Sequence, residues 1–409
     1  MTNPLYDPYA VLHRVYGGGA YLKQALGDTP VEEANRARTA KVCYGVLEND
    51  LYLDFCIKSF APKSPKLPVR ILLKVALYFL LFLNKARYMV TDSAVSLLKK
   101  MGKGGASGFV NAFLRNFDAQ RLSLPAQREA RLSVQYSFPP FAVSRLLAEY
   151  GGEAEEIMRH RPARTFVRFA GQPAQKYLDL PHEQTPFAGV FAYPHFRRDE
   201  GYDRGEYTFQ SVGSVAICAA VDPCGALLDA CAAPGGKSVL LAGKCAHVTA
   251  FELHEHRAAL IGSYAARMGA GNIEVVCRDS SVHDAAYDGK FDAVLVDAPC
   301  SGYGVVGENP DIKLFRKEED IAALHRVQLS ILRACAPYVR EGGALYYSTC
   351  SVFGEENDGT VSAFLEQDPR FVAEAAESPL GHRRTRFGLQ FLPHLSMGAG
   401  FYVCKMRRK

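Results

Sequence analysis

The nine residues Asp229-Ala230-Cys231-Ala232-Ala233-Pro234-Gly235-Gly236-Lys237 constrain this chain more than any other stretch. They follow the apolar run Ala226-Leu227-Leu228 and precede Ser238-Val239-Leu240-Leu241, which predicts a strand, a tight glycine turn and the start of a helix. Two adjacent glycines let the backbone approach a ligand closely, and the N–H groups of the new helix point at any anionic group there. The stretch is typical of a nucleotide site, but it is neither G-x-G-x-x-G nor a phosphate-binding loop. An ordinary strand-to-helix turn has the same local pattern.

Two further stretches downstream each close an apolar strand. One runs from Phe291 to Gly302 and contains Asp297-Ala298-Pro299-Cys300-Ser301-Gly302. The other runs from Gly342 to Ser351 and ends in Ser348-Thr349-Cys350-Ser351. Ligands of an open parallel sheet bind outside the carboxyl ends of its strands. We therefore expect Asp229, Asp297, Cys300 and Cys350 to converge on one cleft.

The three motifs, in this order and spacing, resemble those of the Nop/Sun family of RNA (cytosine-5)-methyltransferases, and the RsmB type in particular. The resemblance implies S-adenosyl-L-methionine as cofactor and RNA as partner, with small-subunit (16S) rRNA as the expected substrate. It implies a cytoplasmic enzyme, and we expect a monomer that does not associate with membranes. The motifs do not reveal the target nucleotide, nor whether naked RNA or a ribosomal particle is the substrate.

The resemblance also assigns roles to residues. The loop that would hold the methionine end of the cofactor consists of Cys231, Ala232, Ala233, Pro234, Gly235, Gly236 and Lys237. Glu252 follows the next strand roughly twenty residues on, where a carboxylate can accept both ribose hydroxyls. Asp279 lies where the family places an acid near the adenine amino group, and Asp297 lies near both the cofactor and the target base.

Carbon 5 of cytosine is a poor nucleophile, so an enzyme must first add a nucleophile at carbon 6, and a thiolate can do this. By resemblance, Cys350 is that nucleophile and forms the thioether adduct, Cys300 assists product release, and Asp297 hydrogen-bonds the base edge. An exchange of roles between Cys300 and Cys350 is the alternative, because related DNA enzymes use the cysteine after proline. The target cytosine must be unpaired or extruded to react.

The pattern of apolar residues predicts three parts. Residues 1–125 read as an all-α domain and residues 126–210 as a small α+β subdomain. Residues 211–409 alternate strands and helices, which predicts a Rossmann-like, doubly wound, mostly parallel sheet. The family resemblance implies that the first part is a NusB-like RNA-binding domain, that the second faces RNA and that the third is a class I methyltransferase domain. Strands are expected near 226–229, 247–252, 273–277, 291–297 and 343–348, with a late antiparallel strand at 400–406. Another helix is expected from Ala142 to Arg159.

Composition limits the class of protein to which the chain can belong. The 409 residues are 48% hydrophobic and 22% charged, which is ordinary for a globular protein. Eleven cysteines without a C-x-x-C pair, and no signal peptide at Met1-Thr2-Asn3-Pro4-Leu5, predict reduced cytosolic thiols. Eight of them, Cys277 included, read as small buried apolar residues. No metal-ligand spacing occurs, and Ile71 to Leu83 is too short to span a bilayer.

The net charge of +5 is uneven, since residues 1–130 carry an excess of basic residues while the remainder is slightly acidic. A basic first domain favours a polyanionic partner such as RNA. The basic residues that we single out as candidate RNA contacts in this domain are Lys63, Lys66, Lys99, Lys100, Lys103 and Arg115. Each has the alternative of a solvated surface charge. Lys313 is a further candidate.

Departures from the family pattern fall at three places. Val167-Arg168-Phe169 stands where members carry Arg-x-Asn, Glu308-Asn309 replaces a common arginine, and Ala399 replaces an aspartate. Arg159, Arg161, Arg164 and Arg168, interleaved with Phe166 and Phe169, would suit single-stranded RNA, with burial of the two phenylalanines in the core as the favoured alternative.

The resulting hypothesis is methyl transfer to carbon 5 of an RNA cytosine through a Cys350 adduct. A tRNA target is the alternative within the same chemistry. A catalytically silent RNA-binding assembly factor is the alternative from another class. A DNA enzyme would leave the Ser-Thr-Cys motif and the helical domain unexplained.

Overall fold

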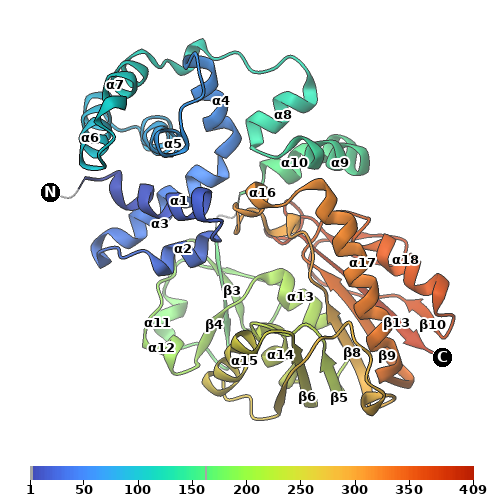
Figure 1. The fold of residues 1–409 in the computed structure, drawn as a ribbon. Helices are drawn as coiled ribbons and strands as arrows, with labels where there is room; N and C mark the ends of the chain where they lie inside the picture. The colour runs from blue at the N-terminus through green and yellow to red at the C-terminus, as the bar shows by residue number, and fades with distance from the viewer. Residues whose placement is uncertain (1–2, 162–163) are drawn as a thin grey trace. The chain divides into compact units, whose positions relative to one another are not determined.

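The computed structural model describes residues 3–161 and 164–409. Met1 and Thr2, which belong to the stretch predicted to lack a signal peptide, lie outside the described residues. The chain divides into two compact units, one formed by residues 1–159 and 308–316 and the other by residues 160–307 and 317–409 (Figure 1). The structure thus groups the helices before Arg159 with the first unit. The boundaries predicted after residues 125 and 210 stay predictions.

The first unit is all-helical. Its main helices are α1 (Tyr6–Gly18), α2 (Leu22–Asp28), α3 (Glu33–Glu48), α4 (Asp50–Phe60), α5 (Leu67–Leu81), α6 (Arg87–Lys100), α7 (Ser107–Asn116), α8 (Arg128–Tyr136), α9 (Pro140–Tyr150) and α10 (Ala154–Arg159). The central helix is α5, whose residues Ile71 to Phe79 are all buried. Helices α3 and α5 approach closely at Gly45, because a Cβ there would lie 2.1 Å from the Tyr78 hydroxyl.

One charged group is buried inside this helical core. Lys74, 1% exposed, places Nζ 2.5 Å from Asp50 Oδ1 and 3.0 Å from Asp54 Oδ2. The Tyr16 hydroxyl donates to the same Asp50 oxygen. Since a buried ammonium requires charged partners, these two aspartates explain how a lysine can interrupt the apolar run of α5.

Residues 308–316 join the helical unit although they lie far along the chain. The short helix α16 (Ile312–Phe315) belongs to this segment. Asp311 Oδ2 accepts a buried hydrogen bond of 2.7 Å from the Leu22 N–H, and Lys313 Nζ donates to the Glu48 carbonyl at 3.0 Å. The ammonium of Lys313 also lies 4.9 Å from the Phe138 ring centroid. Lys313, a candidate RNA contact, is therefore held by the helical unit itself.

The second unit contains a large mixed sheet in the order β11-β12-β13-β9-β8-β5-β6-β7, with β10 paired to β13. Strands β5 to β9 pair in parallel, and the others pair antiparallel. The strand bounds are β5 (Cys224–Asp229), β6 (Cys245–Glu252), β7 (Ile273–Cys277), β8 (Phe291–Asp297), β9 (Val339–Thr349), β10 (Phe371–Glu374), β11 (Arg383–Arg384), β12 (Gly388–Phe391) and β13 (Phe401–Arg408). The mostly parallel, doubly wound sheet is confirmed.

Helices cover both faces of this sheet (Figure 1). Alternate strand residues face opposite layers, so Leu227 packs with α13 (Val212–Ala220) and α14 (Gly236–Ala242), whereas Leu228 packs with α17 (Glu318–Cys335) and α18 (Asp358–Gln367). Such burial on both faces explains the nearly continuous apolar runs of β5 and β8. Helix α15 (Glu255–Arg267) lies between β6 and β7 in the chain.

A second, four-stranded antiparallel sheet of order β2-β3-β1-β4 precedes the large one. Its strands are β1 (Thr165–Phe169), β2 (Glu183–Gln184), β3 (Val190–Tyr193) and β4 (Tyr207–Phe209), and the short helices α11 (Gln175–Leu178) and α12 (Glu200–Asp203) accompany it. Phe166 and Phe169 are buried, as the favoured alternative predicts.

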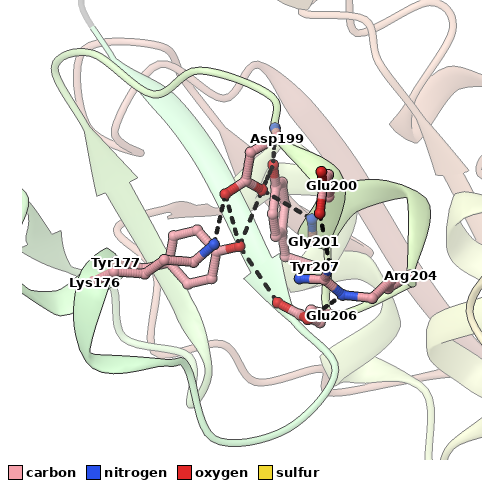
Figure 2. Close-up of polar contacts among 8 residues, drawn as sticks. All are labelled: Lys176, Tyr177, Asp199, Glu200, Gly201, Arg204, Glu206 and Tyr207. Carbon is pink, nitrogen blue, oxygen red and sulfur yellow. Dashed lines mark hydrogen bonds and ion pairs between the residues drawn. The ribbon is translucent and has the colours of Figure 1, made fainter.

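The carboxylate of Asp199 ties this small sheet together (Figure 2). It accepts hydrogen bonds from the Tyr177 and Tyr207 hydroxyls at 3.0 Å, from Lys176 Nζ at 2.8 Å and from the Gly201 N–H at 3.0 Å. Burial alone would raise the pKa of Asp199, but these donors outweigh it and lower the pKa to about 2.

Two local predictions are wrong. The helix expected from Ala142 to Arg159 is broken at Gly151, whose φ of 57° ends α9 before α10 begins. Cys277 is exposed rather than buried, because it lies on β7 at the edge of the sheet. Among residues 3–161 and 164–409, no helix combines the length and apolar character needed to cross a membrane.

Candidate functional site

The glycine loop lies between β5 and α14, as predicted. Gly235 adopts φ of +102°, and a Cβ there would lie 3.2 Å from the Ile261 backbone, so this position requires glycine. Beneath the loop, Ser238 Oγ donates to Asp229 Oδ2 at 2.7 Å. Burial, and secondarily the charge of Asp297, raise the pKa of Asp229 to about 6.

A polar relay reaches this loop from the small sheet. Arg168, on β1, donates through Nε to Gln210 Oε1 at 2.7 Å, and Gln210 Nε2 donates to the Gly236 carbonyl at 3.0 Å. Arg168 is only 8% exposed, so it supports the loop instead of forming the exposed arginine stripe that the sequence allowed. Ser211 accepts from the Ser214 N–H at 3.3 Å and caps α13.

Glu252 and Asp279 lie after neighbouring strands of the sheet. Glu252 ends β6 and is 5% exposed, with Oε1 receiving the His254 N–H at 3.1 Å and Arg257 Nη1 at 3.3 Å. Its other oxygen, Oε2, has no hydrogen-bond partner among the described residues and suits a ligand with hydroxyl donors. Asp279 follows β7 and is exposed, and hydrogen bonds from Ser281 lower its pKa.

Asp297 joins three elements at the centre of the site. Lys237 Nζ lies 2.6 Å from Asp297 Oδ2, and Ser348 Oγ donates to Oδ1 at 2.7 Å. Burial by itself would favour a neutral amine, but the charge and hydrogen bond of Asp297 outweigh it and raise the pKa of Lys237. The lysine of the glycine loop is therefore paired with the carboxylate at the end of β8.

The two cysteines of the downstream motifs lie side by side. Their Sγ atoms are 3.0 Å apart without a disulfide between them, and the Cys350 N–H donates to Cys300 Sγ at 3.2 Å. The hydrogen bond to the Cys350 side chain raises the pKa of Cys300, and burial and the nearby charges of Cys350 and Glu356 raise it further. The expected convergence of Asp229, Asp297, Cys300 and Cys350 at one edge of the sheet is present in the structure.

Sequence reasoning missed a buried carboxylate beneath both cysteine loops. Glu356 is 0% exposed and accepts hydrogen bonds from Ser301 and Ser351, the residues that follow the two cysteines. A serine after each motif cysteine was the available signal, but their common partner lies on a separate turn. Of the departures, Ala399 is buried against Gly213, where a Cβ would come within 2.9 Å of the Ala399 Cβ. A larger residue at 399 would need more room there.

The candidate RNA contacts on the helical unit are all exposed; they are Lys63, Lys66, Lys99, Lys100, Lys103 and Arg115. Lys99 and Arg115 line one groove of about 690 Å³ between α6 and α7. Arg159 and Arg164 lie in ion pairs with Glu155, Glu156 and Glu183. Within the described ranges no group of three or more His, Cys, Asp or Glu residues could hold a metal ion.

Comparisons with known proteins agree with this architecture. Residues 217–407 match the family model of the 16S rRNA methyltransferase RsmB/F, and residues 10–119 match the NusB family. The chain is 33% identical to the probable ribosomal RNA small subunit methyltransferase B of Bacillus subtilis (strain 168), over 95% of this chain and 94% of the relative. It is 32% identical to the ribosomal RNA small subunit methyltransferase B of Sodalis glossinidius (strain morsitans), over 92% and 90% respectively.

The crystal structure of PH0851 shares the fold, with a TM-score of 0.84, 21% identity and coverage of 99% of both chains. Two family models cover the two kinds of domain, and the relatives match along nearly the whole length. This chain therefore belongs to the RsmB/F family of 16S rRNA methyltransferases.

Proposed function

We propose that this methyltransferase modifies carbon 5 of a cytosine in RNA, with small-subunit rRNA as the substrate. The observation that carries the proposal is the pair of Cys300 and Cys350, whose sulfur atoms lie 3.0 Å apart without a disulfide in the loops that follow β8 and β9. Two adjacent thiols suit a reaction in which one sulfur bonds carbon 6 and a second group assists its release. The names of the relatives support rRNA.

S-adenosyl-L-methionine fits the residues that surround the glycine loop, and when bound it would supply an electrophilic methyl group. In the proposal, residues 231–237 hold its methionine end, the open oxygen of Glu252 accepts the ribose hydroxyls, and Asp279 lies toward the adenine. Lys237 already neutralises Asp297, so we assign it first to positioning that carboxylate and second to the cofactor carboxylate.

The chain's own groups carry the covalent chemistry. The Cys350 thiolate bonds carbon 6, and the electrons of the 5,6 double bond move to carbon 5, which becomes nucleophilic. As negative charge builds on the base, ring nitrogen 3 takes up a proton from solvent, and Asp297, held by Lys237 and Ser348, accepts a hydrogen bond from the resulting N–H. After methylation a base removes the carbon 5 proton, the double bond re-forms, and the Cys350 sulfur leaves with its electron pair. We assign assistance of this release to Cys300.

The deciding experiment is transfer of labelled methyl from S-adenosylmethionine to unmodified 16S rRNA, with tRNA in parallel. Label recovered as 5-methylcytosine at one rRNA position supports both the chemistry and the substrate. Label only in tRNA keeps the chemistry and overturns the substrate. Cofactor binding without label in either RNA, or in small-subunit particles, favours the silent assembly factor.

Two variants test the cysteine roles. Cys350→Ala should abolish transfer while cofactor affinity stays near that of the wild type. Cys300→Ala should accumulate a covalent RNA–protein adduct through Cys350, visible as a shifted band in a denaturing gel. An adduct that forms in Cys350→Ala instead would exchange the two roles.

The remaining parts of the proposal concern the setting. The exposed basic residues of the helical unit suit an RNA surface. The division at residues 125 and 210 is kept as a proposal: the boundary at 210 falls between the small sheet and the large one, whereas helices α8 to α10 continue past residue 125. We propose that the protein is cytoplasmic and monomeric. Light scattering of the purified protein would test whether it is a monomer.

A further inference from the structure

The Glu356 carboxylate is a buried polar group of the second unit that the proposed mechanism does not use. It lies on the turn before α18, has no exposed surface and receives four hydrogen bonds. The donors are Ser301 N–H at 2.8 Å, Ser301 Oγ at 2.5 Å, Ser351 Oγ at 2.5 Å and Gln328 Nε2 at 3.1 Å. Both carboxylate oxygens therefore act as acceptors, Oε1 for Ser301 N–H and Gln328, and Oε2 for the two serine hydroxyls.

These donors come from the two loops that carry the cysteines. Ser301 follows Cys300, Ser351 follows Cys350, and the two serine hydroxyls lie 3.1 Å apart around the same Glu356 oxygen. Gln328 of α17 adds a third tie, since its Nε2 also donates to the Pro299 carbonyl at 3.0 Å. One buried carboxylate thus fixes both residues that neighbour the thiols.

We propose that Glu356 is a positioning residue, whose carboxylate clamps the loops of Cys300 and Cys350 so that both sulfurs face one base. The inference rests on the proposed function for the roles of the two sulfurs, but the clamp itself can be tested without RNA. Charge-assisted hydrogen bonds to a buried carboxylate are stronger than neutral ones, so a neutral replacement loosens the clamp.

Electrostatics agree with this placement. The negative charge of Glu356 is among the causes that raise the pKa of Cys300, after its bond to Cys350 and burial. A carboxylate below Cys300 therefore favours a neutral thiol there.

The test is a thiol–disulfide equilibrium of the full-length protein with glutathione. In each exchange the two protein thiols are oxidised to one S–S bond, and one glutathione disulfide is reduced to two glutathione thiols, so electrons and protons balance. Mass spectrometry of peptides gives the equilibrium constant for Cys300–Cys350, which reports how closely the sulfurs are held and not how fast a reagent reaches them. We expect Glu356→Gln to lower this constant about tenfold.

The chain offers an internal control. Cys224 and Cys245 also place their sulfurs 3.1 Å apart, on β5 and β6, and neither contacts Glu356. Their equilibrium constant should stay within twofold of the wild type. An unchanged or increased Cys300–Cys350 constant overturns the inference, and an equal fall for both pairs does so as well, since it indicates general loosening.

A second variant guards against a folding failure at position 356. Ser301→Ala with Ser351→Ala removes two donors while the carboxylate keeps the Ser301 N–H and Gln328, and it should lower the same constant by a similar factor. Tyr338→Phe is the matched control, because it also removes one buried hydroxyl, and that hydroxyl accepts the Asp284 N–H at 2.8 Å, outside the cysteine loops. It should change neither constant.

Turnover separates the inference from the proposed function. For Glu356→Gln we expect kcat to fall at least tenfold, with KM for RNA and cofactor affinity within twofold of the wild type. A wild-type protein without methyl transfer overturns the proposed function, while the thiol equilibrium still decides on the clamp. Wild-type turnover in Glu356→Gln overturns the clamp alone.

Discussion

The pair of Lys237 and Asp297 offers the sharpest test of how the site is held together. Lys237→Met keeps most of the side-chain volume but removes the charge 2.6 Å from Asp297 Oδ2. The two side chains are 14% and 23% exposed, so the abandoned carboxylate regains little water. Removing one partner of a buried ion pair lowers the free energy of unfolding by about 3–5 kcal/mol. We expect about 3 kcal/mol here, because both side chains are partly exposed.

For a unit of this size, that loss lowers the melting temperature by roughly 6 to 12 °C. The chain has no tryptophan, so calorimetry and circular dichroism are suitable probes. Since the pKa of Lys237 is raised, its contribution is complete at neutral pH and disappears only as the pH rises above the ordinary range of lysine. The loss should therefore be constant between about pH 7 and pH 9.

A double-mutant cycle with Asp297→Asn isolates the pair. The double variant should be more stable than the sum of the single effects predicts, with a coupling of about 2 kcal/mol. Lys317→Met is the control, because its side chain is 73% exposed and its removal should cost less than about 0.5 kcal/mol. Additive single effects, or a loss below about 1 kcal/mol for Lys237→Met, would refute the reasoning.

Three further perturbations probe other charged groups. The raised pKa of Asp229, about 6 against 3.8, means that stability present below pH 4 is lost as the pH rises through 6, by about 3 kcal/mol; Asp229→Asn should flatten this fall in thermal melts, and an unaltered pH profile would contradict it. Lys74→Met should destabilise the helical unit by about 3 kcal/mol, with partial recovery when Asp50→Asn is added; independent effects in calorimetry would argue against the buried ion pair. For Asp199, whose pKa is lowered, stability is present above pH 4 and is lost as the pH falls through 2. Because its side chain is 38% exposed and solvent screens the charge, Asp199→Asn should cost only about 1 kcal/mol at pH 7, and much less at pH 2; an equal cost at both would exclude a charge effect.

Much of the fold could be predicted because its signals are local. Strands buried on both faces read as continuous apolar runs, and the expected strand at 291–297 coincides with β8. The glycine loop could also be predicted, since Gly235 has a backbone conformation that few other residue types adopt. The positions after strands β8 and β9 then placed Cys300 and Cys350 together.

What escaped prediction depends on pairing between distant residues. The partner of Lys237 lies sixty residues away, and nothing in the glycine loop indicates it. Glu356 resembles any acid in a turn until the fold surrounds it with serine and glutamine donors. Gly151 breaks a helix that periodicity extended through it, because apolar spacing does not register a positive φ.

The segment 308–316 also has a consequence for biosynthesis. A ribosome releases the chain from its amino end, so helices α1 to α10 emerge while Asp311 and Lys313 are still untranslated. About 150 residues separate Arg159 from these partners, which at about 5–20 residues synthesised per second is a delay on the order of ten seconds. Throughout that interval the Leu22 N–H and the Glu48 carbonyl lack their final partners. The helical unit is therefore complete only after residues 308–316, which lie in the last third of the chain, have been synthesised.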